Sequence, residues 1–178
     1  TVAMEAARDE IGRLSRRISA LVGEDHGAIL QAQLMILQDR SVERELESRL
    51  GAGHRAEAAV AGTLEKYVAT FSRMTNPFFQ ERIYDIKDVF RRIAWHLRPR
   101  GDESTAPAGD DRVILVAREA SVLDLLSVDP DRLAGVAVEH GGAQRHAGIM
   151  ARSLGVPMVG QVVGLLGHGG PGRRLAID

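Results

Sequence analysis

Apolar residues in the first half of the chain recur every three or four positions, which is the spacing of one face of an α-helix. The longest stripe runs from Met4 to Leu21 and predicts an amphipathic helix that ends at Gly23. Further stripes predict four more helices, over residues 25–38, 41–50, 54–74 and 77–97. The short connections between them favour antiparallel hairpins packed as a bundle.

Two of these helices carry start signals. Asn76 followed by Pro77 is typical of an N-cap and a first helical position. Either Asp39 or Ser41 could cap the helix over 41–50, because a short side chain with an oxygen can accept a hydrogen bond from a free backbone N–H of the first turn. The sequence leaves that choice open.

The second half alternates between short β-branched runs and helical segments. Strands are predicted at residues 112–117, 135–139, 156–160 and 173–178. A helix or turn is predicted over 121–129, and a further helix over 146–154. Alternation at this spacing indicates an α/β unit with some parallel strand pairing.

Composition changes near residue 99, which supports a division there. All seven aromatic residues precede this position, and thirteen of the nineteen glycines follow it. The segment 99–111 is rich in Pro, Gly, Asp and Ser and is predicted to be a linker. We therefore expect a helical bundle over 1–98 and an α/β subdomain over 112–178. The aromatic residues, Met35 and Met74 are expected in the core rather than in a cofactor pocket.

Charge and cysteine content exclude several classes of function. The formal net charge is −1, which creates no field for nucleic acid or an anionic membrane. The chain contains no cysteine, so disulfides, thiolate nucleophiles and cysteine metal sites are excluded. No apolar run approaches the ~18–20 residues of a membrane span. These features fit a cytoplasmic protein, and the first residue, which is not Met, and the abrupt end suggest a piece of a longer protein or a naturally reduced relative.

One stretch carries candidate chemistry, since a histidine follows a glycine pair at a predicted helix start. Gly141 and Gly142 allow positive φ angles, so the chain can turn sharply off the preceding strand. The free N–H groups and the dipole of a helix start favour an anion beside His146, and Arg145 could add positive charge. A neutral imidazole is also a nucleophile. The stretch therefore indicates either covalent phosphoryl chemistry at His146 or an ordinary surface histidine.

Other sites are less favoured by the residues. A metal site would need His140, His146 and His168 to converge with Glu139, and their spacing matches no standard ligand pattern, so no metal is expected. The arginine pairs 16–17 and 91–92 are expected on solvated helix faces.

The stretch "GGAQRHAGIMARSLGVPMVG" resembles the phosphohistidine segment of Enzyme I of the phosphoenolpyruvate-dependent phosphotransferase system. That segment typically reads Gly-Gly-x-Thr/Asn-Ser-His, followed by Ile and Ala-Arg-x-Leu-x-x-Pro. Eight residues fall in register with it: Gly141, Gly142, His146, Ile149, Ala151, Arg152, Leu154 and Pro157. Gln144 and Arg145 depart from the pattern, because they replace the Thr/Asn-Ser pair. Related swivelling domains, such as that of pyruvate phosphate dikinase, share the segment.

The helical half distinguishes Enzyme I from these relatives. "LQAQLMILQD" and "ERIYDIKDVFRRIAWHL" resemble its inserted helical subdomain, which docks the small phosphocarrier protein HPr. The resemblance implies carrier contacts at Gln33, Leu37 and Arg40. Gln33 stands where members of the sugar branch often carry a histidine, and Arg40 makes this face less acidic, which suggests a nitrogen-branch Enzyme I with an HPr-like partner.

Carried over to this sequence, the resemblance implies that His146 is phosphorylated on Nε2. The phosphoryl group would come from phosphoenolpyruvate in a C-terminal domain that this chain does not contain and would pass to a histidine of the carrier. Magnesium would act in that C-terminal domain, and no cofactor is expected in this part. Two alternatives remain: a non-catalytic binding module with a degenerate phosphohistidine site, or a swivelling domain of another phosphoenolpyruvate-using enzyme.

Overall fold

The computed structural model describes residues 2–98, 111–141, 146–168 and 172–177. The chain divides into two compact units, Thr1–Asp102 and Glu103–Asp178, and each is described by itself. The predicted linker 99–111 lies almost entirely outside the described residues, so its role as a linker stays a prediction. Within the part of the chain that the structure describes, no helix is both long and apolar enough to cross a membrane.

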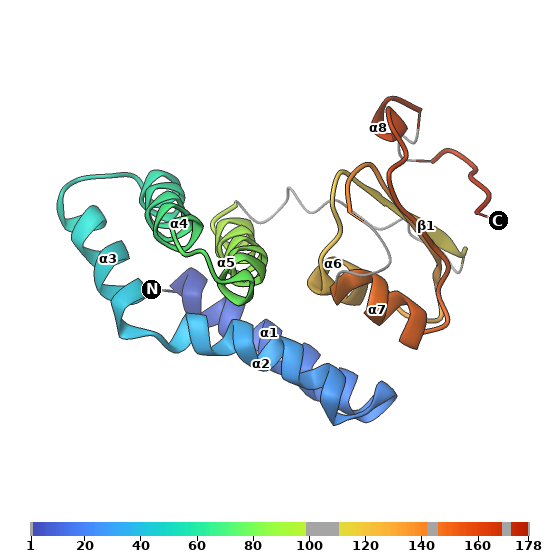
Figure 1. Cartoon of the computed structure of the whole chain (residues 1–178), viewed down its shortest axis with the longest axis horizontal. Helices are drawn as coiled ribbons and strands as arrows, with labels where there is room; N and C mark the ends of the chain where they lie inside the picture. The colour runs from blue at the N-terminus through green and yellow to red at the C-terminus, as the bar shows by residue number, and fades with distance from the viewer. Residues whose placement is uncertain (1, 99–110, 142–145, 169–171, 178) are drawn as a thin grey trace. The chain divides into compact units, whose positions relative to one another are not determined.

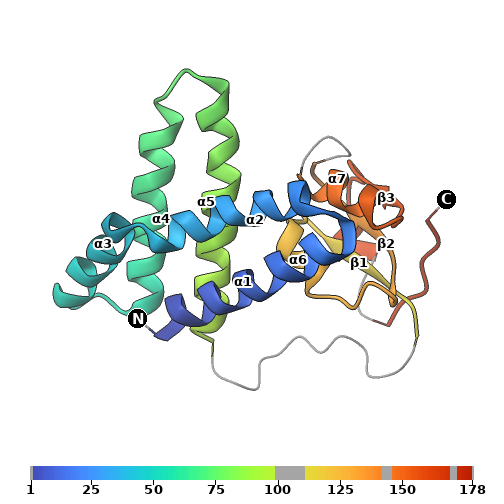
Figure 2. The same ribbon diagram turned by 90° about the horizontal axis from the view of Figure 1, so that it is seen from below.

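Unit 1 is made of five helices, as the hydrophobic stripes predict. They are α1 (Val2–Val22), α2 (Glu24–Gln38), α3 (Arg40–Gly51), α4 (Ala56–Ser72) and α5 (Pro77–His96). The α1–α2 hairpin packs against α5, and α4 and α5 lie side by side as a second hairpin (Figures 1 and 2). The prediction of antiparallel hairpins packed as a bundle is confirmed.

The apolar stripes meet in a shared core, whose side chains are almost fully shielded from solvent. On α1 and α2 it includes Met4, Ala7, Ile11, Ile18, Leu30 and Leu37, and on α5 it includes Ile86, Val89, Phe90 and Ile93. The two hairpin helices α1 and α2 approach closely at Gly27, where a Cβ would lie only 3.4 Å from the Cβ of Ser19. Glycine at this position therefore permits the close contact.

Three residues that the sequence assigns to the core lie on the surface instead. Met35, Tyr84 and Trp95 are 62%, 42% and 37% exposed, so that part of the prediction is wrong. Conversely, Arg92 is not on a solvated face. Its side chain is 10% exposed, with Nη1 3.2 Å from Glu10 on α1.

A single residue connects α2 to α3. The backbone N–H of Asp39 donates to the carbonyl of Ile36 at the end of α2. The side chain of Asp39 accepts from the N–H of Ser41 at 2.7 Å and so caps α3. Of the two caps that the sequence left open, the structure selects Asp39, while the Ser41 hydroxyl lies 2.7 Å from the hydroxyl of Tyr67 on α4.

Unit 2 contains a three-stranded parallel sheet in the order β1-β2-β3. The strands are β1 (Val113–Ala117), β2 (Leu133–Val138) and β3 (Met158–Val159). The connections hold the short helices α6 (Val122–Leu126) and α7 (His146–Ser153), and α8 (Leu165–His168) follows β3. Since both crossovers step across the sheet in one direction, right-handed connection puts α6 and α7 on the same face, where they pack together (Figure 1).

The predicted strand at 173–178 is absent from its described part, residues 173–177. Ile177 instead packs on the middle strand β2. A Cβ on Gly135 would lie 2.8 Å from Cδ1 of Ile177, so the glycine provides the space that this side chain occupies. The last segment thus contributes an apolar side chain to the sheet rather than a hydrogen-bonded strand. The fold class, a helical bundle with a small α/β subdomain, is confirmed.

Candidate functional site

The candidate site is built at the carboxyl end of β2. Beyond the strand, the N–H of Glu139 donates to Ala117 at 3.2 Å and the N–H of His140 donates to Arg118 at 2.8 Å. These bonds continue the pairing with β1 for two further residues. Gly141 then adopts φ +99°, which directs the chain off the sheet as the glycine pair predicts.

His146 is the first residue of α7, so the predicted helix start is confirmed. The helix is anchored by Ala147, Met150 and Ala151, which are buried, while His146 is half-buried at its end. The first turn contains no acidic residue that would neutralise the positive end of the helix dipole. An anion attached to His146 would therefore lie at the positive end of the α7 dipole.

The residues predicted to hold the phosphate are only partly described. Gly141 turns the chain as expected, whereas Gly142 and Arg145 lie outside the described residues, as does Gln144. The role of Arg145 stays a prediction.

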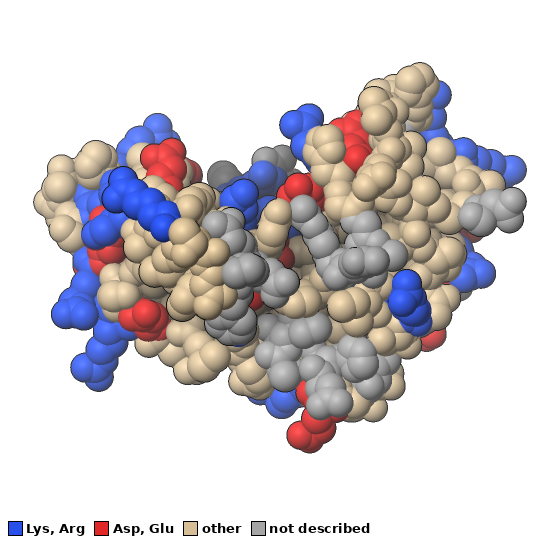
Figure 3. All heavy atoms as spheres, viewed as in Figure 1, with Lys and Arg blue, Asp and Glu red and all other residues tan. Residues whose placement is uncertain are grey.

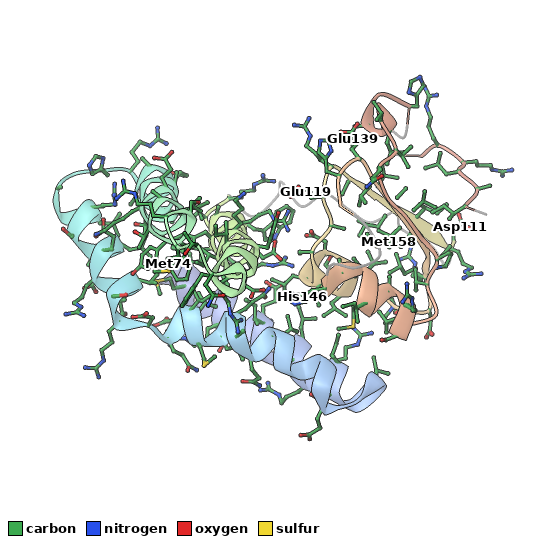
Figure 4. All side chains as sticks on the ribbon, viewed as in Figure 1. Met74, Asp111, Glu119, Glu139, His146 and Met158 are labelled. Carbon is green, nitrogen blue, oxygen red and sulfur yellow. The ribbon has the colours of Figure 1, made fainter. Side chains whose placement is uncertain are left out.

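Glu139 makes contacts that the sequence did not single out. Its Oε1 accepts a hydrogen bond from the backbone N–H of Leu166 at 3.2 Å, and its Oε2 lies 3.7 Å from Nε of Arg118. Figure 4 shows Glu139 and His146 well apart, so the carboxylate does not touch the imidazole. The only signal in the sequence is the position of an acidic residue directly after a buried strand.

The three residues of unit 1 that are predicted to contact the carrier differ in their burial. Gln33 and Leu37 are each 1% exposed, so neither side chain is available to a docked protein. The carbonyl of Leu37 accepts a hydrogen bond from Arg8 on α1, and Oε1 of Gln33 has no hydrogen-bond partner among the described residues. Arg40 is exposed, as expected of a contact residue. The expectation for Gln33 and Leu37 therefore needs correction.

The exposed side of α2 carries a different set of residues. Gln31, Met35 and Gln38 are exposed and lie four and three positions apart, on one face of the helix. We call these three residues the α2 stripe. The sequence contained the signal, because Met35 is two positions from both Gln33 and Leu37 and thus on the opposite side of the helix from them.

A polar network joins α3 to α4. Glu45 pairs with Lys66 of α4 and accepts from Nε of Arg49 at 2.9 Å. Hydrogen bonding from Lys66, and less strongly from Arg49, holds the pKa of Glu45 below its ordinary value although burial opposes the shift. The backbone N–H and the hydroxyl of Ser41 likewise lower the pKa of Asp39.

Among the described residues, no group of three or more His, Asp or Glu side chains is placed to hold a metal ion. His140 and His168 are exposed residues at separate points of unit 2. Acidic and basic side chains are interspersed on the face shown in Figure 3. Of the histidines in the described part of unit 2, His146 is the one that lies at the start of a helix.

Two family models match the chain. One describes the N-terminal part of PEP-utilising enzymes and matches residues 1–82. The other describes the mobile domain of PEP-utilising enzymes and matches residues 109–178. The two matches correspond to the helical unit and to the α/β unit.

Relatives include a Salmonella typhimurium protein named "Phosphoenolpyruvate-dependent phosphotransferase system", which is 38% identical over 160 residues, 89% of this chain and 21% of that protein. A Listeria innocua protein named "Phosphoenolpyruvate-protein phosphotransferase" is 32% identical over 159 residues, 88% of this chain and 27% of that protein. The chain thus spans only the stated 21% and 27% of their lengths.

Solved structures extend the similarity. The "N-terminal domain of Enzyme 1 - Nitrogen" is 35% identical with a TM-score of 0.68, and the match covers 90% of this chain and 65% of that one. An NMR structure of Enzyme I has the same TM-score at 24% identity, covers 92% of this chain and 66% of that one, and supports the fold alone. The chain therefore belongs to the phosphoenolpyruvate-utilising enzymes, as a part corresponding to the N-terminal region of Enzyme I of the phosphotransferase system.

Proposed function

We propose that His146 carries a phosphoryl group between phosphoenolpyruvate, bound in a C-terminal domain, and a histidine of a small phosphocarrier of the HPr type. The observation that carries the proposal is the position of the imidazole at the first residue of α7, five positions after Gly141, whose φ is +99°. The names of the relatives support the reaction class. Magnesium in the C-terminal domain and a cytoplasmic location stay predictions.

The reaction consists of two displacements at phosphorus. Nε2 of His146 attacks the phosphoryl group, the N–P bond forms, and the P–O bond to enolpyruvate breaks with the electron pair leaving on oxygen. A ring nitrogen of the carrier histidine then attacks the same phosphorus, and the bond to His146 breaks. Catalysis of such transfers is mostly positioning and electrostatic stabilisation, which the N-terminus of α7 supplies.

The exposed residues of unit 1 support a carrier-binding surface that differs from the one predicted from the sequence. It comprises the α2 stripe with Met35 at its centre, continued by Arg40 at the start of α3. Methionine is flexible and polarisable and adapts to a partner surface. Arg40 would repel the basic surface of a standard HPr, which favours a less basic carrier.

Labelling from a phosphorylated carrier tests the proposal. The full chain is incubated with ³²P-phosphorylated HPr and, in parallel, with its nitrogen-branch paralogue. We expect acid-labile, base-stable label in the chain and none in a His146→Ala variant. His140→Ala and His168→Ala are matched controls, since both histidines are exposed in the same unit and both variants should label normally.

Label that persists in His146→Ala would disprove the assignment to this residue. An Arg145→Ser variant then shows whether the unusual neighbour of His146 takes part in transfer. An unchanged rate of phosphoryl transfer in that variant would show that Arg145 takes no part in the reaction.

A second candidate function is a non-catalytic binding module. Gln144 and Arg145, which replace the usual hydroxyl-bearing pair, favour it. Intact-mass spectrometry after exposure to either phosphorylated carrier separates the two functions. A gain of one phosphate excludes the inert module, whereas an unchanged mass together with carrier binding supports it.

A further inference from the structure

One side of α7 exposes a large apolar residue. Four residues of the helix pack inside unit 2: Ala147, Gly148, Met150 and Ala151. Ile149 is instead 40% exposed, and the other exposed residues of α7 are polar. A single exposed apolar side chain is ordinary in itself, so its significance depends on what lies beside it.

The residue beside Ile149 on this helix is His146. Residues three positions apart in a helix are neighbours on one face, with Cβ atoms about 5–6 Å apart. Helical side chains lean toward the helix N-terminus, so each covers the surface over the turn that precedes its own Cα. For Ile149 that is the turn that begins with His146. The exposed isoleucine therefore borders the half-buried imidazole.

The packing of α7 in unit 2 does not account for the exposed part of Ile149. Ala147 and Ala151, which are four positions apart and buried, share one face of the helix. Ile149 is two positions from each of them and so lies on the opposite side. Its carbonyl accepts a hydrogen bond from Oγ of Ser153 at 3.1 Å, but that bond stays within the helix and uses the backbone alone. The apolar surface of Ile149 therefore faces outward from the packed side of α7.

We infer that Ile149 contacts the HPr-type carrier during phosphoryl transfer, an inference that rests on the proposed function. The carrier histidine can attack phosphorus on Nε2 of His146 only when the reacting atoms come within about 3–3.5 Å of each other. At that distance the protein surface around the carrier histidine covers the surface that borders His146, which includes Ile149. The contact is thus continuous with the one that the reaction itself requires. It buries apolar area and so favours the aligned pair of histidines.

A small phosphoryl donor would make no such contact, which provides a test. With phosphoramidate, the bond from phosphorus to Nε2 of His146 forms, the P–N bond of the protonated donor breaks, and the electron pair leaves with ammonia. This donor reaches the imidazole without bringing a second protein surface against α7. A role of Ile149 in docking should therefore appear in transfer from the carrier and be absent from labelling by phosphoramidate.

The experiment compares Ile149→Gln, Ile149→Leu and Leu175→Gln with the unchanged full chain, at a temperature at which circular dichroism shows all of them folded. Glutamine removes the apolar surface without adding a charge that would act on the phosphoryl group. Leu175 is the matched control, because it is an apolar residue of the same unit with 39% exposure.

Two quantities are measured: the second-order rate constant for transfer from phosphorylated HPr or its paralogue, and the rate of labelling by phosphoramidate. In Ile149→Gln we expect transfer from the carrier to slow by about fivefold or more, because the apolar contact is lost. Labelling of this variant by phosphoramidate should stay within about twofold of the unchanged chain, since that donor does not use the contact. Ile149→Leu, which keeps an apolar side chain of the same volume, and Leu175→Gln should stay within about twofold in both measurements.

The outcomes separate the two proposals. If the unchanged chain takes no label from either carrier, the proposed function fails, whatever phosphoramidate does. If it labels and Ile149→Gln accepts the group from the carrier at the same rate, the contact role of Ile149 is wrong. An equal loss of labelling by phosphoramidate would show that the substitution disturbs His146 itself. A loss in Ile149→Leu or Leu175→Gln as large as in Ile149→Gln would show that the apolar surface at this position is not what matters, and either result would also overturn the inference.

Discussion

Arg49 lies over the backbone of Gly62, where a Cβ would come within 3.0 Å of the guanidinium Cζ. Arg49 belongs to α3 and Gly62 to α4, and the same guanidinium donates from Nε to Glu45. Glycine within a helix is unfavourable by about 1 kcal/mol relative to alanine. At this position the missing methyl group makes room for the arginine.

A Gly62→Ala substitution should therefore raise the free energy of unfolding more in a variant that lacks the Arg49 side chain. Alone, it gains helix propensity but displaces a partly exposed guanidinium, so we expect a small net change in the free energy of unfolding. In an Arg49→Ala background the same substitution should stabilise by about 1 kcal/mol. Urea unfolding of the four proteins in this double-mutant cycle measures the difference, and equal effects in both backgrounds would contradict the packing described.

Gln33→Met should stabilise unit 1. Within the part of the chain that the structure describes, the side-chain oxygen of Gln33 is buried without a hydrogen-bond partner, and such a group costs about 1–3 kcal/mol. Methionine has nearly the same shape and has no side-chain oxygen that requires a hydrogen bond. We expect a rise of about 1 kcal/mol in the free energy of unfolding, against almost none for Gln38→Met, the exposed control on the same helix. Destabilisation by Gln33→Met would instead indicate that a buried water satisfies the oxygen.

Asp39 should make the helical unit sensitive to acid. Its pKa is lowered chiefly by the backbone N–H of Ser41, so the folded state binds the proton less readily than the unfolded chain. The stabilising contribution is thus complete above the ordinary aspartate pKa and is lost as pH falls through the lowered value. Asp39→Asn keeps a capping oxygen that does not titrate.

The stability difference between the unchanged chain and Asp39→Asn should accordingly shift in favour of the variant below about pH 4. Urea unfolding between pH 3 and 7 provides the measurement. Asp39→Ala serves as the control, because it lacks the cap at every pH and should be about 1 kcal/mol less stable near neutrality. A difference between the unchanged chain and Asp39→Asn that does not vary with pH would exclude a titrating cap.

Met35→Asp should weaken carrier binding without unfolding the bundle. The side chain is 62% exposed at the centre of the α2 stripe, so its replacement removes apolar contact at little cost to folding. We expect the Kd for the carrier that labels the chain to rise about tenfold, which corresponds to ~1.4 kcal/mol. Isothermal titration calorimetry measures the Kd. Gln33→Met is the matched control, and a larger effect from this buried position would restore the original contact prediction.

The sequence could predict most of the fold because periodicity reflects burial directly. The stripe from Met4 to Leu21 and the β-branched run near 113–117 both formed the expected element, although Leu21 at the end of the stripe is exposed. The proposed strand at 173–178 failed for a different reason. A strand needs a partner edge, and β-branched residues such as Ile177 pack equally well as single side chains over a glycine.

The candidate site was predictable only where local rules decide the geometry. The turn at Gly141 and the helix start at His146 follow from backbone chemistry within a few residues. The contact between Glu139 and Leu166 joins residues 27 apart, and no local pattern encodes it. Met35 was misplaced because an apolar residue is read as buried by default, although its position relative to Gln33 puts it on the other side of the helix.

The one-residue connection at Asp39 has a consequence for recognition of a carrier protein. Asp39 alone connects α2 to α3 and caps the start of α3, so the α2 stripe and Arg40 are joined by a very short connection. A partner that contacts both helices would therefore order less chain on association than it would if a long loop joined them, and would lose less conformational entropy. Discrimination between carriers on this surface would then depend on the match of side chains on either side of this short connection, and a single substitution there could change which carrier is accepted.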